Sequence, residues 1–263
     1  MSEVSMTGKT VVPLPVMAVG EYLLNAFLPM RCPCCDRGVA SGLGLCGTCW
    51  QQIRFLERPW CQRMGTPFTH DVGENALSPR AIADPPEFDR LRAVAFYSGP
   101  AKDLVLALKF ARRRELAEAM GIWMARSGNE FLGDSLVIPV PLHWTRLWQR
   151  RFNQAADLAR VAADISGAEY APFVLKRTKR TQQQVGLPAK ERIRNVRRAF
   201  QVPGDQLQKL AGRRVVLVDD VYTTGSTISA CTKVLKSAGA GTVDVLTFAL
   251  ADPANHEDVD RPD

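Results

Sequence analysis

The stretch that decides the fold reads Val-Val-Leu-Val-Asp-Asp-Val-Tyr-Thr-Thr-Gly-Ser-Thr, residues 215–227. The apolar run over 215–218 predicts a buried strand, and two adjacent acids, Asp219 and Asp220, follow it directly. A turn rich in hydroxyl groups and glycine comes next, and residues 228–237 have the pattern of a helix. The unpaired N–H groups and the positive dipole end of a helix N-terminus favour a phosphate. The carboxylates would repel that phosphate, so we expect them to face sugar hydroxyls or a metal ion.

The composition fits a cytoplasmic globular protein of one or two domains. The chain has 263 residues, of which 46% are hydrophobic, enough for a globular core. Its net charge of +7 favours anionic ligands such as phosphorylated metabolites, nucleic acids or acidic membranes, without choosing among them. The most apolar N-terminal stretch, residues 11–30, is interrupted by Pro13, Pro15, Glu21 and Asn25. We therefore expect neither a membrane span nor a signal peptide.

Alternating strand and helix patterns over residues 91–250 predict a doubly wound α/β sheet. Ligands of such sheets bind at the carboxyl ends of the strands, which is where Asp219 and Asp220 fall. No internal repeat is evident. The expected strands are 91–97, 136–140, 215–218 and 243–250, and the expected helices are 101–110, 116–123, 153–165 and 228–237.

Two C-x-x-C pairs, separated by ten residues, predict a structural zinc site in a small ribbon. Four thiolates would close the tetrahedral coordination and leave no open position for catalysis. The alternative is a set of buried free thiols, and Cys34 could compete with its neighbour for the metal. Cys61 has no partner at C-x-x-C spacing, because position 64 is Met. The predicted ligands are Cys32, Cys35, Cys46 and Cys49.

These patterns divide the chain into five segments. Residues 1–30 are predicted to form a tail with a short amphipathic helix, and residues 31–65 the zinc ribbon. Residues 66–90 are rich in Pro, Asp, Gly, Ser and Asn and are interpreted as a linker. Residues 91–250 would form the α/β domain, and residues 251–263 a disordered acidic tail.

Two basic stretches could meet an anionic ligand. In residues 138–154, a Pro-Val-Pro turn precedes His143 and three arginines that could contact a pyrophosphate or a nucleic-acid backbone; His143 itself is interpreted as structural. Residues 176–198 hold nine Lys or Arg side chains against one acid. This second stretch could be a lid that closes over an anionic leaving group. The alternative is an ordinary solvated charged face.

Four motifs in this order resemble the ComF family, which is related to competence protein F and combines an N-terminal zinc ribbon with a phosphoribosyltransferase-like domain. They are the cysteine pairs, the segment from the Pro-Val-Pro turn to Arg-Arg-Phe-Asn-Gln, the pattern Q-x-x-G-L-x-x-x-x-R, and residues 215–227. The resemblance spans about residues 24–250 and includes Tyr97 and Lys109 in a Y…LKF pattern.

This resemblance implies a type I phosphoribosyltransferase-like doubly wound parallel sheet that binds 5-phosphoribosyl-1-pyrophosphate (PRPP) with Mg²⁺. By position, Asp219 and Asp220 would hold the ribose hydroxyls. The phosphate contacts would be Thr223, Thr224, Gly225, Ser226 and Thr227. The basic residues that bind the rest of the ligand would be Arg151, Arg177, Lys179, Lys190 and Arg192.

The resemblance also implies a reaction, the transfer of phosphoribosyl to an unidentified acceptor as in a pentosyl-type glycosyltransferase. Purine-type relatives carry an acid at the position of Thr223, which argues against a purine acceptor. The alternative function is a nonenzymatic factor in DNA uptake that binds single-stranded DNA or partner proteins, with PRPP as a regulatory ligand or remnant.

Two positions depart from the family pattern. Relatives have a second cysteine pair near Cys61, and only Cys61 remains here, so we expect a single zinc ion. The family motif Arg-Gly-Phe-Asn-Gln is Arg151-Phe-Asn-Gln here, preceded by Arg150, and the absent glycine removes some backbone freedom from that loop.

Overall fold

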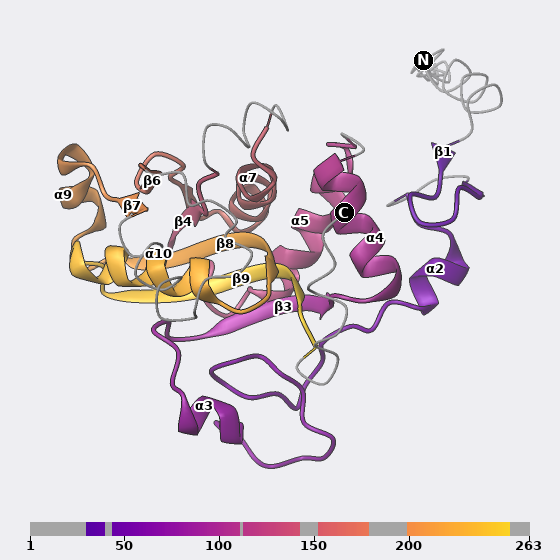
Figure 1. The fold of residues 1–263 in the computed structure, drawn as a ribbon, viewed down its shortest axis with the longest axis horizontal. Helices are drawn as coiled ribbons and strands as arrows, with labels where there is room; N and C mark the ends of the chain where they lie inside the picture. Colours follow the sequence, from indigo (N-terminus) through magenta and orange to yellow (C-terminus); the bar gives the residue numbers. More distant parts are fainter. Residues whose placement is uncertain (1–29, 40–43, 111–112, 143–151, 179–198, 253–263) are drawn as a thin grey trace, which may run out of the picture. The chain divides into compact units, whose positions relative to one another are not determined.

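The computed structural model describes residues 30–39, 44–110, 113–142, 152–178 and 199–252. The chain divides into two compact units, residues 1–46 and 47–263. No helix of the described residues is long and apolar enough to cross a membrane. The elements, labelled as in Figure 1, are β1 (Met30–Arg31), β2 (Gly38–Val39), α2 (Gly47–Gln51), α3 (Pro79–Ala83), β3 (Leu91–Phe96), α4 (Gly99–Phe110), α5 (Leu116–Ser127), β4 (Leu136–Pro139), α7 (Gln154–Ser166), β5 (Glu169–Tyr170), β6 (Lys176–Arg177), β7 (Phe200–Gln201), the 3₁₀ turn η1 (Gly204–Gln206), α9 (Leu207–Leu210), β8 (Arg214–Tyr222), α10 (Ser226–Ser237) and β9 (Thr242–Leu250).

In the first unit, β1 and β2 form a short antiparallel pair, with Met30 opposite Val39 and Arg31 opposite Gly38. The turn between them begins at Cys32. This pairing is too short to be stable alone, which fits a module that depends on a bound metal.

The second unit is built on a five-stranded sheet in the order β3-β9-β8-β4-β5, and every neighbouring pair in it is parallel. The central strand is β8, which pairs with β4 on one side and β9 on the other. Its residues 215–218 are completely buried, as expected for a strand covered on both faces. The predicted doubly wound parallel sheet is therefore confirmed.

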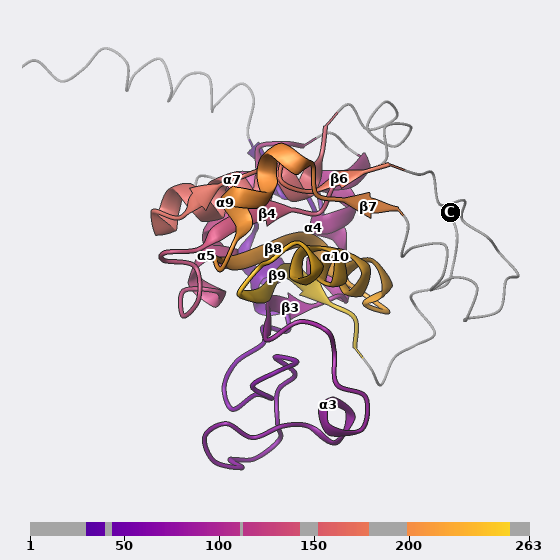
Figure 2. The ribbon, with the colours of Figure 1, turned by 90° about the vertical axis from the view of Figure 1, so that its left-hand side faces the viewer.

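The helices cover both faces of this sheet. The chain moves from β3 to β4 to β5 in one direction across the sheet and returns through β8 to β9 in the other. Because parallel crossovers are right-handed, α4, α5 and α7 lie on one face and α10 on the other. Figure 2 shows the strands stacked edge to edge with α5 on one side and α10 on the opposite side.

The four predicted strands and four predicted helices are present, with one informative difference. Strand β8 does not stop at the acidic pair but runs on to Tyr222, because pairing with β9 continues as far as Tyr222 opposite Leu250. The backbone hydrogen bonds of a central strand outweigh the weak strand preference of aspartate. Strand β5 and the β6–β7 hairpin were not predicted, since two-residue strands carry no periodicity. The predicted N-terminal helix lies outside the described residues.

One ion pair ties the amino end of β3 to β9. Asp244 of β9 is completely buried, and its carboxylate accepts two hydrogen bonds from the guanidinium of Arg90, at 2.9 and 2.8 Å. The Arg90 side chain is 32% exposed. The hydrogen bonds from Arg90 to Asp244 raise the pKa of the guanidinium, and burial only partly opposes them. A buried charge of this kind is tolerated because its partner makes a bidentate contact.

We expect Asp244→Asn to lower the free energy of unfolding by about 2 kcal/mol, since it leaves the partly buried Arg90 without its counter-charge. Urea denaturation followed by circular dichroism measures the change. The matched control is Asp134→Asn, an exposed acid in the turn before β4. Equal stability of the two variants would contradict a structural role for the Arg90–Asp244 pair.

Candidate functional site

The acidic pair lies near the carboxyl end of the central strand, where the apolar cover of the sheet ends. The carboxylate of Asp220 is 3.1 Å from the ammonium group of Lys109, near the end of α4. Both side chains are mostly buried, at 12% and 18% exposure. Lys109 therefore neutralises one of the two negative charges, which weakens the repulsion that the pair would exert on an anionic ligand.

The two carboxylates face different helices, because successive side chains of a strand point to opposite faces. Asp220 faces α4. The buried thiol of Cys231 on α10 has a raised pKa, mainly through burial and also through the negative charge of Asp219. The Asp219 carboxylate also accepts a hydrogen bond of 2.9 Å from the N–H of Asp220, which orients it at the strand end.

Tyr97, which follows β3, completes the group of side chains around Asp220. Its N–H donates to the carbonyl of Leu250 at 2.8 Å, which fixes it beside the end of β9. Burial raises the pKa of the Tyr97 phenol, and the charges of Asp220 and Asp103 add to this rise. The structure thus brings Tyr97 and Lys109 together with Asp220, although they come from separate elements.

The predicted phosphate turn links β8 to α10. Gly225 precedes the first residue of α10 and has a left-handed backbone, with φ of 75°. The hydroxyl oxygens of Thr224 and Ser226 lie 3.0 Å apart, and the N–H of Ser226 points to Thr224 Oγ1 at 3.5 Å. Thr223, Thr224 and Ser226 are exposed, so hydroxyl and N–H groups of the turn are accessible to an anion. Thr227 follows in the first turn of α10.

The side chain of Tyr222 packs against the turn at Gly225. Its side chain is buried, which raises the pKa of its phenol. Its ring meets the ring of Phe88 edge to face, with centroids 5.9 Å apart. A Cβ atom at Gly225 would collide with the Tyr222 hydroxyl. Glycine is therefore required at position 225 for two reasons, the left-handed backbone and the close approach of Tyr222.

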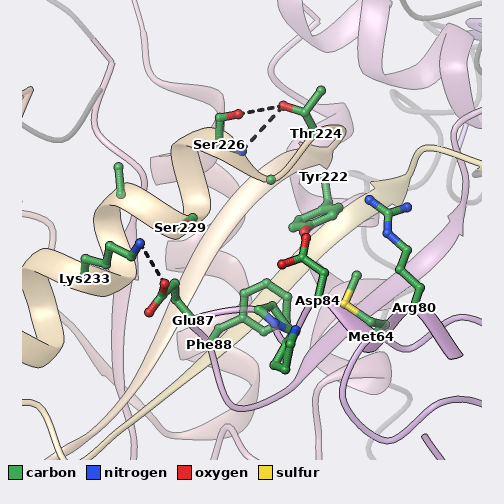
Figure 3. Close-up of a pocket in the computed structure, with 14 residues that line it drawn as sticks. Met64, Arg80, Asp84, Glu87, Phe88, Tyr222, Thr224, Ser226, Ser229 and Lys233 are labelled. Carbon is green, nitrogen blue, oxygen red and sulfur yellow. Dashed lines mark hydrogen bonds and ion pairs between the residues drawn. The ribbon is translucent and has the colours of Figure 1, made fainter. Parts of the chain in front are cut away.

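A cavity of about 300 Å³ lies between the phosphate turn and residues 64–88 (Figure 3). An ion pair of 2.7 Å between Glu87 and Lys233 lies across one part of it. A second cavity, of about 320 Å³, lies at the ends of β8 and β9. The part of the first cavity that residues 64–88 form was not predicted, because this stretch contains no recognisable motif. The side chains labelled in Figure 3 are Met64, Arg80, Asp84, Glu87, Phe88, Tyr222, Thr224, Ser226, Ser229 and Lys233.

Four of the five basic residues that were predicted to contact the ligand lie outside the described residues. They are Arg151, Lys179, Lys190 and Arg192. Arg177 ends the short strand β6, and its guanidinium carbon lies 5.3 Å from the centroid of the Phe200 ring. Its contact with a ligand remains a prediction.

The four cysteines predicted as zinc ligands are brought together. The sulfur atoms of Cys32, Cys35, Cys46 and Cys49 all lie within 4.8 Å of one another. At a Zn–S distance of about 2.3 Å, tetrahedral geometry places the sulfur atoms roughly 3.8 Å apart, so this group fits zinc. Burial raises the pKa of the Cys32 thiol, but the N–H groups of Cys46, Cys34 and Cys35 outweigh it and lower the pKa to about 6. This favours the thiolate form that zinc binds.

Two domain families match the sequence in separate regions. The double zinc ribbon domain matches residues 23–81, and the phosphoribosyl transferase domain matches residues 154–263. The first match covers the four clustered cysteines and continues past Cys61, and the second covers the acidic pair and the phosphate turn.

Relatives with descriptive names are similar over most or part of this chain. A DNA utilization protein YhgH from Shigella flexneri is 33% identical over 225 residues, which cover 83% of this chain and 96% of the relative. Competence protein F from Haemophilus influenzae is 30% identical over 232 residues, covering 86% and 99%. Competence protein ComFC from Streptococcus pneumoniae is 30% identical over 159 residues, covering 60% and 66%. With its four clustered cysteines, its parallel sheet and these relatives, the chain belongs to the ComF family, in which a zinc ribbon precedes a phosphoribosyltransferase domain.

Proposed function

We propose that this protein binds PRPP at the carboxyl end of β8 and transfers its phosphoribosyl group to an acceptor. The observation that carries the proposal is the arrangement around β8: an acidic pair with one charge balanced by Lys109, followed by an accessible hydroxyl-rich turn at the start of a twelve-residue helix. This order suits a ligand with sugar hydroxyls beside a phosphate group.

Each part of PRPP has a matching group. The 5′-phosphate would accept hydrogen bonds from the N–H and hydroxyl groups of the turn, where the dipole of α10 favours negative charge. The ribose hydroxyls would donate to the carboxylates of Asp219 and Asp220. These acids also fit Mg²⁺, which prefers oxygen ligands. The ion would enter bound to the pyrophosphate of PRPP and help to neutralise the charge of the pyrophosphate.

The proposed reaction is displacement at C1 of the ribose. The bond from C1 to the pyrophosphate oxygen breaks as the acceptor forms a bond to C1, and positive charge develops on the ribose in the transition state. The carboxylates of the acidic pair would stabilise this charge, and the basic residues of 176–192 would neutralise the departing pyrophosphate. Thr223 has no acidic group to serve as a general base, which favours an acceptor other than a purine.

A second candidate function rests on the names of the relatives. Proteins described as a competence protein and a DNA utilization protein are similar over most of this chain. We therefore also propose a role in the uptake or use of DNA, through binding of single-stranded DNA or of partner proteins. We also propose a cytoplasmic location, where cysteines more often act as metal ligands than form disulfides.

We expect calorimetry to detect PRPP binding by the unmodified protein in the presence of Mg²⁺. The double variant Asp219→Asn, Asp220→Asn should bind PRPP at least tenfold more weakly, because the neutral amides are poorer acceptors for the ribose hydroxyls. The control Asp134→Asn also loses one negative charge, but at an exposed position away from the strand end. No binding by the unmodified protein would reject the PRPP proposal. Equal binding by the double variant would reject only the role of the acidic pair.

We expect Gly225→Ala to abolish PRPP binding, since the new Cβ would collide with Tyr222 and strain the left-handed backbone at φ 75°. A Cβ at position 225 would also lie 2.7 and 3.0 Å from two ring atoms of Tyr222, so the double variant Tyr222→Ala, Gly225→Ala is needed to remove the collision while keeping the backbone strain. Tyr222→Ala alone measures the effect of losing the ring. Gly133→Ala is the control, because no atom lies within 4 Å of a Cβ built there. Unchanged calorimetric affinity for PRPP in Gly225→Ala would show that this turn does not hold the phosphate.

The DNA-binding proposal is tested with a short fluorescent single strand. If the basic segments contact the phosphate backbone, anisotropy titrations should show affinity that falls steeply between about 50 and 200 mM salt. An excess of PRPP in a parallel titration tests whether the two ligands compete. Absence of binding at the lowest salt concentration would remove single-stranded DNA as a ligand and leave partner proteins.

A further inference from the structure

The backbone around Cys61 repeats the backbone around the zinc ligand Cys32. The N–H of Cys32 donates to the carbonyl five residues further on, and its own carbonyl accepts the N–H four residues further on. Cys61 makes the same two hydrogen bonds at the same spacings. The fourth residue after each cysteine has a left-handed backbone, with φ of 58° at Asp36 and 62° at Gly65. The two turns are therefore copies of one zinc-knuckle geometry.

The correspondence extends to the flanking elements. In each copy, the residue directly before the cysteine forms an antiparallel bridge with a second residue. This second residue lies six positions after the cysteine. A five-residue helix completes each copy, since α2 begins directly after Cys46 and α3 begins directly after Ser78. The bridged residues are Arg31 with Gly38 in the first copy, and Trp60 with Pro67 in the second.

This repeat assigns a counterpart to each zinc ligand. In chain order, the counterparts of Cys32, Cys35, Cys46 and Cys49 are Cys61, Met64, Ser78 and Ala81. The match to the double zinc ribbon domain ends at residue 81, the last of these positions. Only Cys61 offers a thiolate, so the donor set of the second copy does not fit zinc. Within the described part of the chain, the four cysteines of the first copy are the one group of three or more His, Cys, Asp and Glu side chains that could hold a metal ion by themselves.

Protein contacts occupy the place of the metal in the second copy. The sulfur of Cys61 accepts hydrogen bonds from the N–H groups of Met64, at 3.4 Å, and Ser78, at 3.1 Å. The hydroxyl of Ser78 accepts from the N–H of Ala81, at 3.3 Å, and so caps α3. Cys61, Met64 and Ala81 are 0%, 5% and 2% exposed and belong to the core that includes the sheet.

We propose that the second ribbon of this protein is a zinc knuckle converted into a metal-free plug, in which the thiol of Cys61 and the packing of Met64 and Ala81 replace the ion. The chain then carries one zinc, held by its first ribbon. The conversion has a consequence for the candidate site, because Met64 lines both cavities beside Tyr222 and Ser78 lines the second. The second ribbon thus lines the cavities next to the phosphate turn, and its structure there does not depend on a bound metal ion.

Zinc analysis of the purified full-length protein tests the proposal. We expect one zinc per chain in the unmodified protein and in Cys61→Ser, and none in the double variant Cys32→Ser, Cys49→Ser. The Cys61→Ser count is read on the soluble fraction, so a loss of stability does not obscure it. Two zinc ions in the unmodified protein, or a loss of zinc in Cys61→Ser, would overturn the proposal.

Restoring the lost ligands gives a second, independent readout. We expect the triple variant Met64→Cys, Ser78→Cys, Ala81→Cys to bind two zinc ions per chain, because it places four thiols in the knuckle geometry of the first copy. The control Met64→Cys alone provides two thiols and should still hold one zinc. A folded triple variant that holds only one zinc would overturn the assignment of these positions. If the triple variant is insoluble, the counts for the unmodified protein and Cys61→Ser decide the question.

Discussion

The burial of β8 on both faces constrains the rest of the molecule. A central parallel strand must be apolar as long as helices cover it, and its residues 215–218 are completely buried. Along β8, charged side chains fall outside the apolar run, and the acidic pair lies near the carboxyl end of the strand. Even there Asp220 is largely buried, and the ion pair with Lys109 offsets the cost of its burial. The position and the net charge of the candidate site thus both follow from the burial of one strand.

The same strand couples the phosphate turn to a distant part of the sequence. Tyr222, the last residue of β8, packs on Phe88 and approaches Gly225 so closely that no side chain is tolerated there. The left-handed backbone at Gly225 rests on an aromatic pair that joins the turn to the segment after the second ribbon. A preorganised turn loses little freedom when an anion binds, which favours affinity.

The two ribbons illustrate different ways to stabilise a small loop-rich module. The first brings four cysteines together beside a two-residue strand pair, where a metal ion can replace hydrophobic burial. The second lies against the core that includes the sheet, so Met64 and Ala81 can be buried there and a metal is dispensable. In the second ribbon, packing and hydrogen bonds to the Cys61 thiol hold the same backbone geometry.

The amino-acid sequence alone predicts the parts of this protein whose signal is local. The apolar run, the acidic pair and the glycine turn lie within thirteen consecutive residues, and cysteine spacing alone identified the four clustered thiols. Only the tertiary structure revealed the ion pair between Lys109 and Asp220, the support of Gly225 by Tyr222 and Phe88, and the repeat that relates Cys61 to Cys32. These contacts join residues far apart in the chain, and the repeat persists in backbone hydrogen bonds after most of its cysteines have changed. Neither can be seen in a local pattern of residue types, because each depends on how the folded chain brings its segments together.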